Sequence, residues 1–128
     1  MRLLLDTHVA LWAITDDRRL PARARQLILT ARNEVWVSAA SIWEIAIKHA
    51  LARRDMPVSG HQAAAWFQEA GYQCLAISAA HAAAVEELPA IHRDPFDRLL
   101  VAQALTEPLR LLTHDRTVAS YSDTIIWA

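Results

Sequence analysis

Short, continuously apolar segments alternate with longer segments of helical periodicity, and this order constrains the fold more than any other feature of the chain. The strands predicted from the apolar segments are 3–5, 35–37, 74–77, 109–112 and 124–127. The helices predicted between and after them are 8–14, 21–32, 39–53, 62–70, 79–88, 95–106 and 114–120. Short strands that are apolar throughout are typical of parallel sheets covered by helices on both faces. The alternation therefore predicts a three-layer α/β/α sandwich around a mostly parallel sheet of about five short strands, with right-handed crossovers.

Length and composition are those of one folded domain spanning residues 1–128. A hydrophobic fraction of 54% with 21% charged residues argues against disorder. The net charge of -1 provides no general attraction to nucleic acid or to a membrane. Twelve of the thirteen basic residues are arginine, which suits phosphate binding but is equally expected from a GC-rich genome. The arginine bias alone therefore decides nothing.

The compartment is predicted from the single cysteine and from the absence of long apolar runs. Cys74 can form no intrachain disulfide, which fits a reducing compartment, and we expect it to pack in the core on a strand. Asp6 interrupts the first apolar stretch, so no signal peptide is expected. No uncharged apolar run reaches the roughly 18 residues of a membrane span. A soluble, cytoplasmic protein is predicted.

Four carboxylates stand where an apolar segment ends or a helix begins, at Asp6, Glu44, Asp97 and Asp115. A carboxylate beside such apolar segments is costly unless its charge is balanced. The carboxyl ends of parallel strands meet at one edge of a sheet, which is where ligands of such sheets bind. We therefore expect the four acids to gather there. A cluster that offers only oxygen atoms suits Mg²⁺ or Mn²⁺ better than zinc.

Three of these acids also have a structural interpretation that needs no ligand. Asp6 and Asp115 stand between a predicted strand and a predicted helix, where aspartate is a good N-cap. Glu44 fits a capping box with Ser41 and lies four residues before Lys48. Its helix is apolar on both sides, which predicts burial and a partner stronger than an exposed lysine. Both interpretations stay open.

Asp97 is the acid for which capping explains least. Asp94 is a good N-cap and Pro95 a good first residue, which places Asp97 at the third helical position, where the helix dipole favours an anion. Asp97 nevertheless shares a helix face with Leu100 and Val101, and that face belongs in the core. A carboxylate on an apolar face near a helix start indicates a ligand at the edge of the sheet. Asp94 is interpreted as structural.

Several other kinds of site are excluded by residues that the chain lacks. Gly60 and Gly71 are the only glycines, so no glycine-rich phosphate loop is possible. Serine hydrolase chemistry lacks its nucleophile elbow. An aspartyl-phosphate enzyme needs a second acid near the first and a lysine on a later strand, whereas the only lysine is Lys48 on a helix.

Histidines and tryptophans leave alternatives open. Three histidines flank the acids, as solvated loop residues or as contacts to phosphate or a partner: His8, His92 and His114. The five tryptophans are expected mostly in the core, although three of them could form an apolar surface for a partner helix: Trp12, Trp43 and Trp66. The sequence therefore also allows a catalytically inactive module that only binds a protein partner or RNA.

Four segments carry a resemblance to a known family. In chain order they are Leu-Leu-Leu-Asp6-Thr-His, Ser-Ile-Trp-Glu44-Ile-Ala-Ile-Lys, His-Arg-Asp-Pro-Phe-Asp97-Arg-Leu-Leu-Val-Ala-Gln-Ala and Leu-Thr-His-Asp115. With them the chain resembles PIN-domain ribonucleases, particularly VapC-type toxins of bacterial toxin–antitoxin systems, over essentially its whole length. The resemblance implies RNA cleavage dependent on Mg²⁺ or Mn²⁺, dimerisation or a toxin–antitoxin hetero-oligomer, and a small antitoxin partner.

The resemblance also implies a role for each residue of the site. Asp6, Glu44 and Asp97 would hold the first cation, Asp115 would complete the site or recruit a second cation, and Glu44 would help to take a proton from water. Thr7 and Thr113 are candidates to orient the carboxylates, and Arg98 and Arg116 to contact phosphate. Many relatives carry a further acid after the last segment, where this chain has Arg116 and Thr117, so the number of cations stays open.

Overall fold

Five parallel strands form one sheet in the order β3-β2-β1-β4-β5 in the computed structural model, which describes residues 1–128. The strands are β1 (Arg2–Leu5), β2 (Glu34–Ser38), β3 (Gln73–Leu75), β4 (Arg110–Thr113) and β5 (Ile126–Trp127). Leu5 at the end of β1 pairs with Val37 on one side and with Leu112 on the other. The three central strands therefore end side by side, and the residues that follow them share one edge of the sheet.

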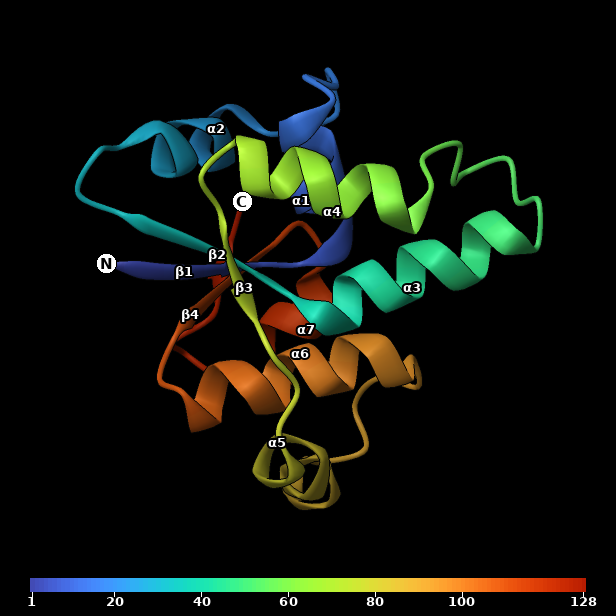
Figure 1. The fold of residues 1–128 in the computed structure, drawn as a ribbon. Helices are drawn as coiled ribbons and strands as arrows, with labels where there is room; N and C mark the ends of the chain where they lie inside the picture. Colours follow the sequence, from blue (N-terminus) through green and yellow to red (C-terminus); the bar gives the residue numbers. More distant parts are fainter.

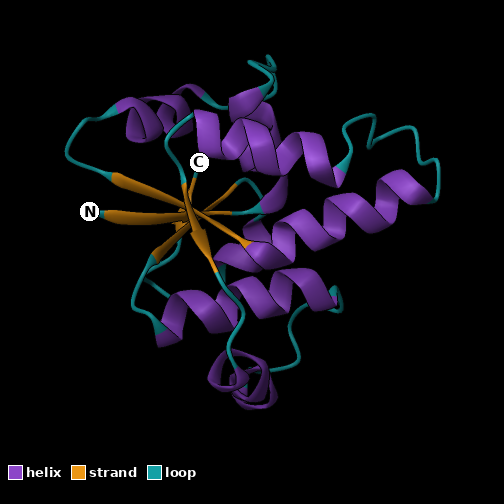
Figure 2. Ribbon diagram, viewed as in Figure 1, coloured by secondary structure: helices purple, strands orange, loops and turns teal.

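Helices lie above and below this sheet (Figures 1 and 2). They are α1 (Thr7–Ile14), α2 (Ala22–Leu29), α3 (Ala39–Ala50), α4 (Gly60–Glu69), α5 (Ala79–Ala84), the 3₁₀ helix η1 (Val85–Glu87), α6 (Pro95–Thr106) and α7 (Arg116–Ala119). Together with the sheet they confirm the predicted α/β/α sandwich, and every strand pairing is parallel. No helix is both long and apolar enough to cross a bilayer.

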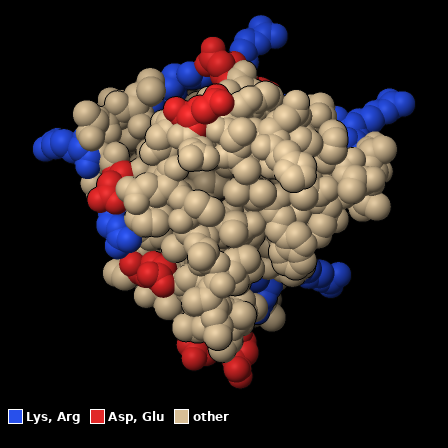
Figure 3. Space-filling model, viewed as in Figure 1, with Lys and Arg blue, Asp and Glu red and all other residues tan.

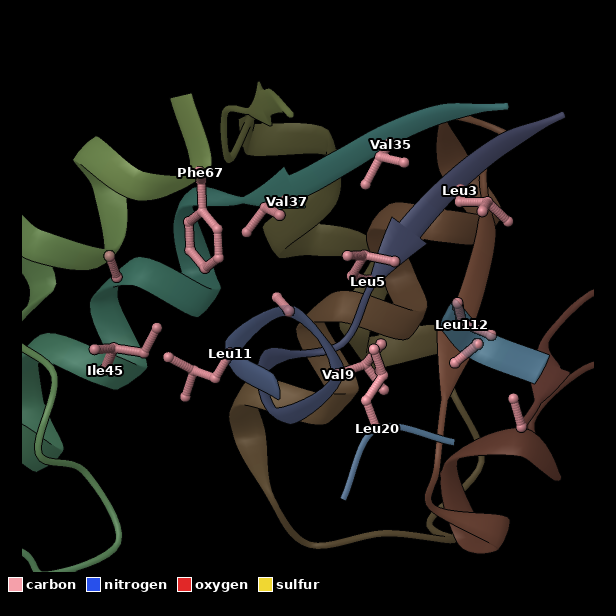
Figure 4. Close-up of a cluster of buried hydrophobic side chains, with 14 of the residues drawn as sticks. Leu3, Leu5, Val9, Leu11, Leu20, Val35, Val37, Ile45, Phe67 and Leu112 are labelled. Atoms are coloured by element: carbon pink, nitrogen blue, oxygen red, sulfur yellow. The ribbon is translucent and has the colours of Figure 1, made fainter. Parts of the chain in front are cut away.

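Alternation along β1 separates two hydrophobic cores. Leu3 and Leu5 point into the larger core with Val9 of α1 and Phe67 of α4 (Figure 4). Leu4 points to the opposite face, into the core built mainly by α6 and β4. All three leucines are fully buried. Burial of β1 on both faces is the physical basis of its unbroken apolar sequence.

Four expectations from the sequence are corrected by the structure. Cys74 is exposed because β3 is an edge strand. The second apolar side of α3 faces solvent, with Trp43 54% exposed and Leu51 also exposed, so this helix is not buried all round. The helix expected over 79–88 is divided into α5 and η1. None of the five tryptophans belongs to the buried core.

Candidate metal centre and active site

The four acids reach one edge of the sheet from four different elements. Asp6 directly follows β1, and Asp115 comes two residues after the end of β4. Glu44 extends from the second turn of α3, and Asp97 from the first turn of α6. Because β1 and β4 are neighbours that end in register, their following residues are brought together. The carboxylates of Asp6, Glu44 and Asp115 all raise the pKa of Asp97 by repulsion.

Asp6 caps a helix and faces the other carboxylates at the same time. Its Oδ1 accepts a hydrogen bond from the backbone N–H of Val9 at 2.9 Å, and its Oδ2 accepts one from the Thr113 hydroxyl. Burial raises the pKa of Asp6, the two hydrogen bonds oppose that rise, and the charge of Glu44 adds to it. The N-cap interpretation is therefore true of Asp6 without excluding a ligand, since each carboxylate oxygen has a second lone pair.

Glu44 is 2% exposed and is held through both of its oxygens. The Thr7 hydroxyl donates to Oε1 at 2.7 Å, and Lys48 Nζ lies 2.6 Å from Oε2. The Lys48 side chain is itself only 16% exposed, so this ion pair is much less solvated than the sequence indicated. Thr7, one of the two residues expected to orient a carboxylate, therefore contacts Glu44 directly.

The capping box expected from Ser41 and Glu44 does not exist. The N-cap of α3 is Ser38, whose hydroxyl accepts from the backbone N–H of Ala40 at 2.9 Å. Ser41 lies within the helix, with its hydroxyl 3.0 Å from that of Thr7. The helix begins at Ala39, as its predicted range indicated, so Ser41 is not its N-cap and Glu44 lies too far along α3 to reach the N-cap backbone. Its burial then serves something other than capping.

Asp97 is the acid whose charge is least compensated. Asp94 caps α6 by accepting from the N–H groups of Phe96 and Asp97, as expected. Burial, together with repulsion from neighbouring carboxylates, raises the pKa of Asp97 to about 8. These carboxylates belong to Asp94, Asp6, Glu44 and Asp115. A group that gains this much from losing its charge is one that a cation would stabilise.

Thr113 connects the two acids that follow β1 and β4. Its hydroxyl donates to Asp6 and accepts the backbone N–H of Asp115 at 3.0 Å. Asp115 caps α7 through Oδ1, as the structural interpretation proposed, while its side chain remains 45% exposed. The cluster therefore runs from buried Asp6 and Glu44 out to solvent at Asp115, which leaves it open on one side.

His92 belongs to this site, although the sequence placed it no closer than a flanking loop. Its Nε2 lies 3.3 Å from Asp97 Oδ2 and 3.5 Å from Asp115 Oδ2. The backbone N–H of Asp94 donates to Nδ1 at 3.0 Å, so the proton of the neutral ring is on Nε2, facing the two acids. The only signal in the sequence is a histidine two residues before the N-cap of α6.

The two arginines expected to contact phosphate have different surroundings. Arg98 donates to the backbone carbonyls of Pro89, Val85 and Leu88 and to the Tyr121 hydroxyl. These bonds tie the segment before α6 to that helix, so the guanidinium of Arg98 is occupied within the chain. We therefore do not propose a phosphate contact for Arg98.

Arg116 presents its charge at the surface. Its Cζ lies 3.9 Å from the centre of the Trp127 ring, a cation–π contact, and the side chain is exposed. Its guanidinium edge makes no hydrogen bond within the chain. It remains beside Asp115 as a candidate for phosphate.

The donor set fits a hard divalent cation. Asp6, Glu44 and Asp115 all act on Asp97 through their charge, and His92 lies beside Asp97 and Asp115. Lys48 is the only other basic side chain paired with any of the four acids. His92, Asp97 and Asp115 already offer ligand atoms that lie within 4.8 Å of one another. Carboxylate oxygens are the ligands preferred by Mg²⁺ and Mn²⁺. A cation here would offset the repulsion that raises the pKa of Asp97.

Comparison with known proteins gives the class to which this fold and site belong. The family model described as "PIN domain" matches residues 3–123. The chain belongs to the PIN-domain family. It is 34% identical over 122 residues to ribonuclease VapC22 of Mycobacterium tuberculosis, covering 93% of this chain and 91% of that protein.

Solved structures share the fold at lower sequence identity. VapBC2 of Rickettsia felis, crystallised with a DNA fragment from its promoter, aligns with a TM-score of 0.69 at 16% identity, over 100% of this chain and 98% of that one. FitAcB of Neisseria gonorrhoeae aligns with a TM-score of 0.65 at 17% identity, over 98% and 96%. A toxin–antitoxin complex of Klebsiella pneumoniae aligns with a TM-score of 0.63 at 19% identity, over 97% and 95%. At these identities the likeness establishes the fold.

Proposed function

We propose that this chain is a metal-dependent ribonuclease that acts as the toxin of a toxin–antitoxin pair. The observation that carries the proposal is the convergence of Asp6, Glu44, Asp97 and Asp115 at one edge of the sheet, where their repulsion raises the pKa of Asp97. Its similarity to a protein named a ribonuclease supports RNA as the substrate. We expect the protein to act in the cytoplasm, where the RNA of a bacterial cell lies.

Each side chain of the cluster would have its own role in binding the cation. Asp6, Glu44 and Asp97 would hold Mg²⁺ or Mn²⁺, and Asp115 would complete the site from its exposed side. A cation in this position lowers the pKa of water and neutralises charge on the scissile phosphate. Thr113 keeps Asp6 in place. A single cation is the simplest occupancy, since Arg116 stands where a further acid would be needed.

Thr7 and Lys48 fix the position of Glu44, because its two oxygens accept hydrogen bonds from the Thr7 hydroxyl and the Lys48 ammonium group. Each oxygen keeps a second lone pair that a cation could use. Glu44 is therefore assigned to cation binding. The exposed guanidinium of Arg116 would contact a phosphate of the RNA.

A protein partner would bind a different face. The face formed by α4, β3 and α3 carries charged side chains mainly along its margins (Figure 3). A pocket between these elements is lined mainly by apolar side chains, including Ile42, Ala64 and Cys74. The structural relatives named as toxin–antitoxin complexes support an apolar segment of an antitoxin, or a second copy of this chain, as the partner.

Purified protein should cleave RNA only with Mg²⁺ or Mn²⁺ present, and Asp97→Asn should abolish cleavage while keeping the fold. Asp123→Asn, at an exposed aspartate, is the matched control and should cleave normally. Hydrolysis by water predicts products with a 5′-phosphate and a 3′-hydroxyl, which sequencing of the RNA ends would identify. Wild-type rates from Asp97→Asn would refute the catalytic assignment. Inactive wild-type protein that still binds a partner would support the module without catalysis.

A further inference from the structure

Four aromatic rings and one guanidinium form a continuous row that begins beside the carboxylates. The ring centres of His8 and Trp12 are 6.0 Å apart, those of Trp12 and His114 are 5.8 Å apart, and those of His114 and Trp127 are 5.8 Å apart. Arg116 extends the row over Trp127. We call these five residues the aromatic row. His8 and Arg116 adjoin the segments that carry Asp6 and Asp115, so the row borders the candidate metal centre.

Core packing does not account for the row. His8, His114, Trp127 and Arg116 are exposed, and Trp12 is half-buried. Trp127 keeps 36% of its surface in solvent at the end of β5. Single exposed aromatic residues are common, but a contiguous exposed group of rings marks an interaction surface. The row therefore has the properties of a contact surface.

The row continues into a basic cleft on the α2 side of the molecule. This cleft has a volume of about 780 Å³, and its lining includes Arg18, Arg19, Arg25 and His114. His114 belongs to both the cleft and the row, and the guanidinium of Arg19 also lies 5.6 Å from the Trp12 ring. One surface thus leads from the cleft, across the rings, to the acids.

The charge balance along this surface favours a ligand held by rings more than by ion pairs. Arg19 is paired with Asp17 and Arg25 with Asp16, each at 2.8 Å. Arg18 makes no ion pair, which leaves a small positive excess in the cleft. A duplex presents only phosphates and sugars to such a surface, whereas unpaired bases can stack on aromatic rings and on arginine planes. Flat rings beside a modest positive charge match single-stranded nucleic acid.

We propose that the aromatic row is a base-stacking track for single-stranded RNA, which places an unpaired stretch of the strand across the carboxylates. The inference rests on the proposed ribonuclease function and deepens it by locating the path of the strand on this chain. Trp127 supplies a ring that is 36% exposed, and Arg116 above it offers guanidinium N–H groups to a phosphate. The bases stack along the row, while Arg18 neutralises the backbone at its far end.

The test measures binding separately from cleavage. A short fluorescent oligouridine is titrated in EDTA against protein carrying Asp97→Asn, so that no RNA is cut. Adding Trp127→Leu should weaken binding by about tenfold, because a base loses its aromatic partner. Trp127→Phe should restore most of the affinity. Trp66→Leu is the matched control, since Trp66 on α4 is 37% exposed against 36% for Trp127, and it should leave binding unchanged.

Salt dependence and a competitor sharpen the result. Trp127→Leu should reduce affinity by the same factor at low and high salt, because an indole carries no charge, whereas Arg116→Gln should make the dependence on salt shallower. Duplex RNA should compete poorly. Unchanged oligouridine binding by a folded Trp127→Leu protein would overturn the proposal, and so would equal competition by duplex.

Two further outcomes separate this inference from the proposed function. If wild-type protein cleaves no RNA but binds oligouridine through Trp127, the result supports the stacking track and refutes the proposed nuclease function. If the protein is a metal-dependent nuclease, and Trp127→Leu changes neither RNA binding nor RNA cleavage, the result supports the nuclease function and refutes the stacking track. Loss of self-association in Trp127→Leu, measured by sedimentation with RNA binding intact, would make the row a protein interface and refute the proposal.

Discussion

Two groups of polar side chains lie against the same sheet, each with a buried part and one exposed end, and they differ in how their charges are balanced. One is the carboxylate cluster of Asp6, Glu44, Asp97 and Asp115. The other, here called the Gln103 network, consists of Ser38, Gln103, His81 and Glu107. Within it Ser38 donates to Gln103 Oε1, Gln103 Nε2 donates to the Ala76 carbonyl at 3.3 Å, and His81 contacts Glu107. Every member has a partner of complementary character.

The difference is one of charge and not of burial. In the Gln103 network the backbone N–H of Ser78 donates to His81 Nδ1 at 3.0 Å, which leaves the proton of a neutral ring on Nε2, facing Glu107. Its donors match its acceptors, as expected of a network that stabilises a fold. The carboxylate cluster gathers like charges instead. That arrangement lowers stability in the protein alone and becomes favourable only with a cation, which is the behaviour of a ligand site.

Adding a divalent cation should stabilise the protein through the carboxylate cluster and not through the Gln103 network, and this should be the clearest difference between the two groups. A cation that binds only the native state raises the free energy of unfolding by about 2.7 kcal/mol at a concentration of 100 Kd. Thermal denaturation with Mn²⁺ and with EDTA measures the shift in Tm. A protein with Gln103→Leu should show the same shift as wild type, while Asp97→Asn should lose most of it. Equal shifts in all three proteins would mean that the cation binds elsewhere.

Gln103→Leu should disrupt the Gln103 network and so destabilise the fold. Removing the amide leaves the buried Ser38 hydroxyl without its partner, so the free energy of unfolding should fall by about 1–3 kcal/mol in urea denaturation. Gln68→Leu replaces an exposed glutamine on α4 and should change it by less than about 0.5 kcal/mol. RNA cleavage per folded molecule should match wild type with Gln103→Leu. A variant as stable as wild type would show that the Gln103 network is not structural.

In the metal-free protein, the carboxylate cluster should make the free energy of unfolding depend on pH. The native pKa of Asp97 is raised from 3.8 to about 8 and that of Asp6 is also raised, so the native state binds protons that the unfolded chain has released. The contribution of these two acids to the free energy of unfolding should therefore be full below about pH 4 and should be lost as pH rises to about 8. Melting curves in EDTA would measure the fall, and Asp97→Asn should flatten it. A Tm that rises over this range would contradict the assigned direction.

The fold was predictable because its determinants are local. Strands buried on both faces need unbroken apolar runs such as Leu3, Leu4 and Leu5, and the strand-to-helix order then allows few topologies. The same regularity placed Asp6 and Asp115 at one edge. Asp97 was also accessible, because its capping residue Asp94 fixes the register of α6.

Features that depend on contacts between distant segments were not predictable. His92 enters the site because the loop before α6 brings its ring beside Asp97 and Asp115. The i,i+4 spacing predicted the Glu44–Lys48 pair, but that Thr7 bonds to Glu44 depends on where α1 packs against α3. Arg98 seemed equivalent to Arg116 in the sequence, yet only the fold decides which guanidinium is occupied by backbone carbonyls. Such pairings depend on three-dimensional packing that no periodicity encodes.

Asp115→Asn should have the smallest effect on stability, so a change in its activity would reflect the chemistry of the site and not a loss of folded protein. Asparagine caps a helix about as well as aspartate, and the side chain is 45% exposed, so the free energy of unfolding should change by less than about 0.5 kcal/mol. If the exposed end of the cluster completes the cation site, Mg²⁺-dependent cleavage should nevertheless fall by about tenfold or more, because one ligand charge is lost. Asp94→Asn, a substitution at the N-cap of the neighbouring helix, serves as the control and should retain cleavage. Full activity in Asp115→Asn would confine the working site to Asp6, Glu44 and Asp97, and the role of Asp115 would then be that of a helix cap.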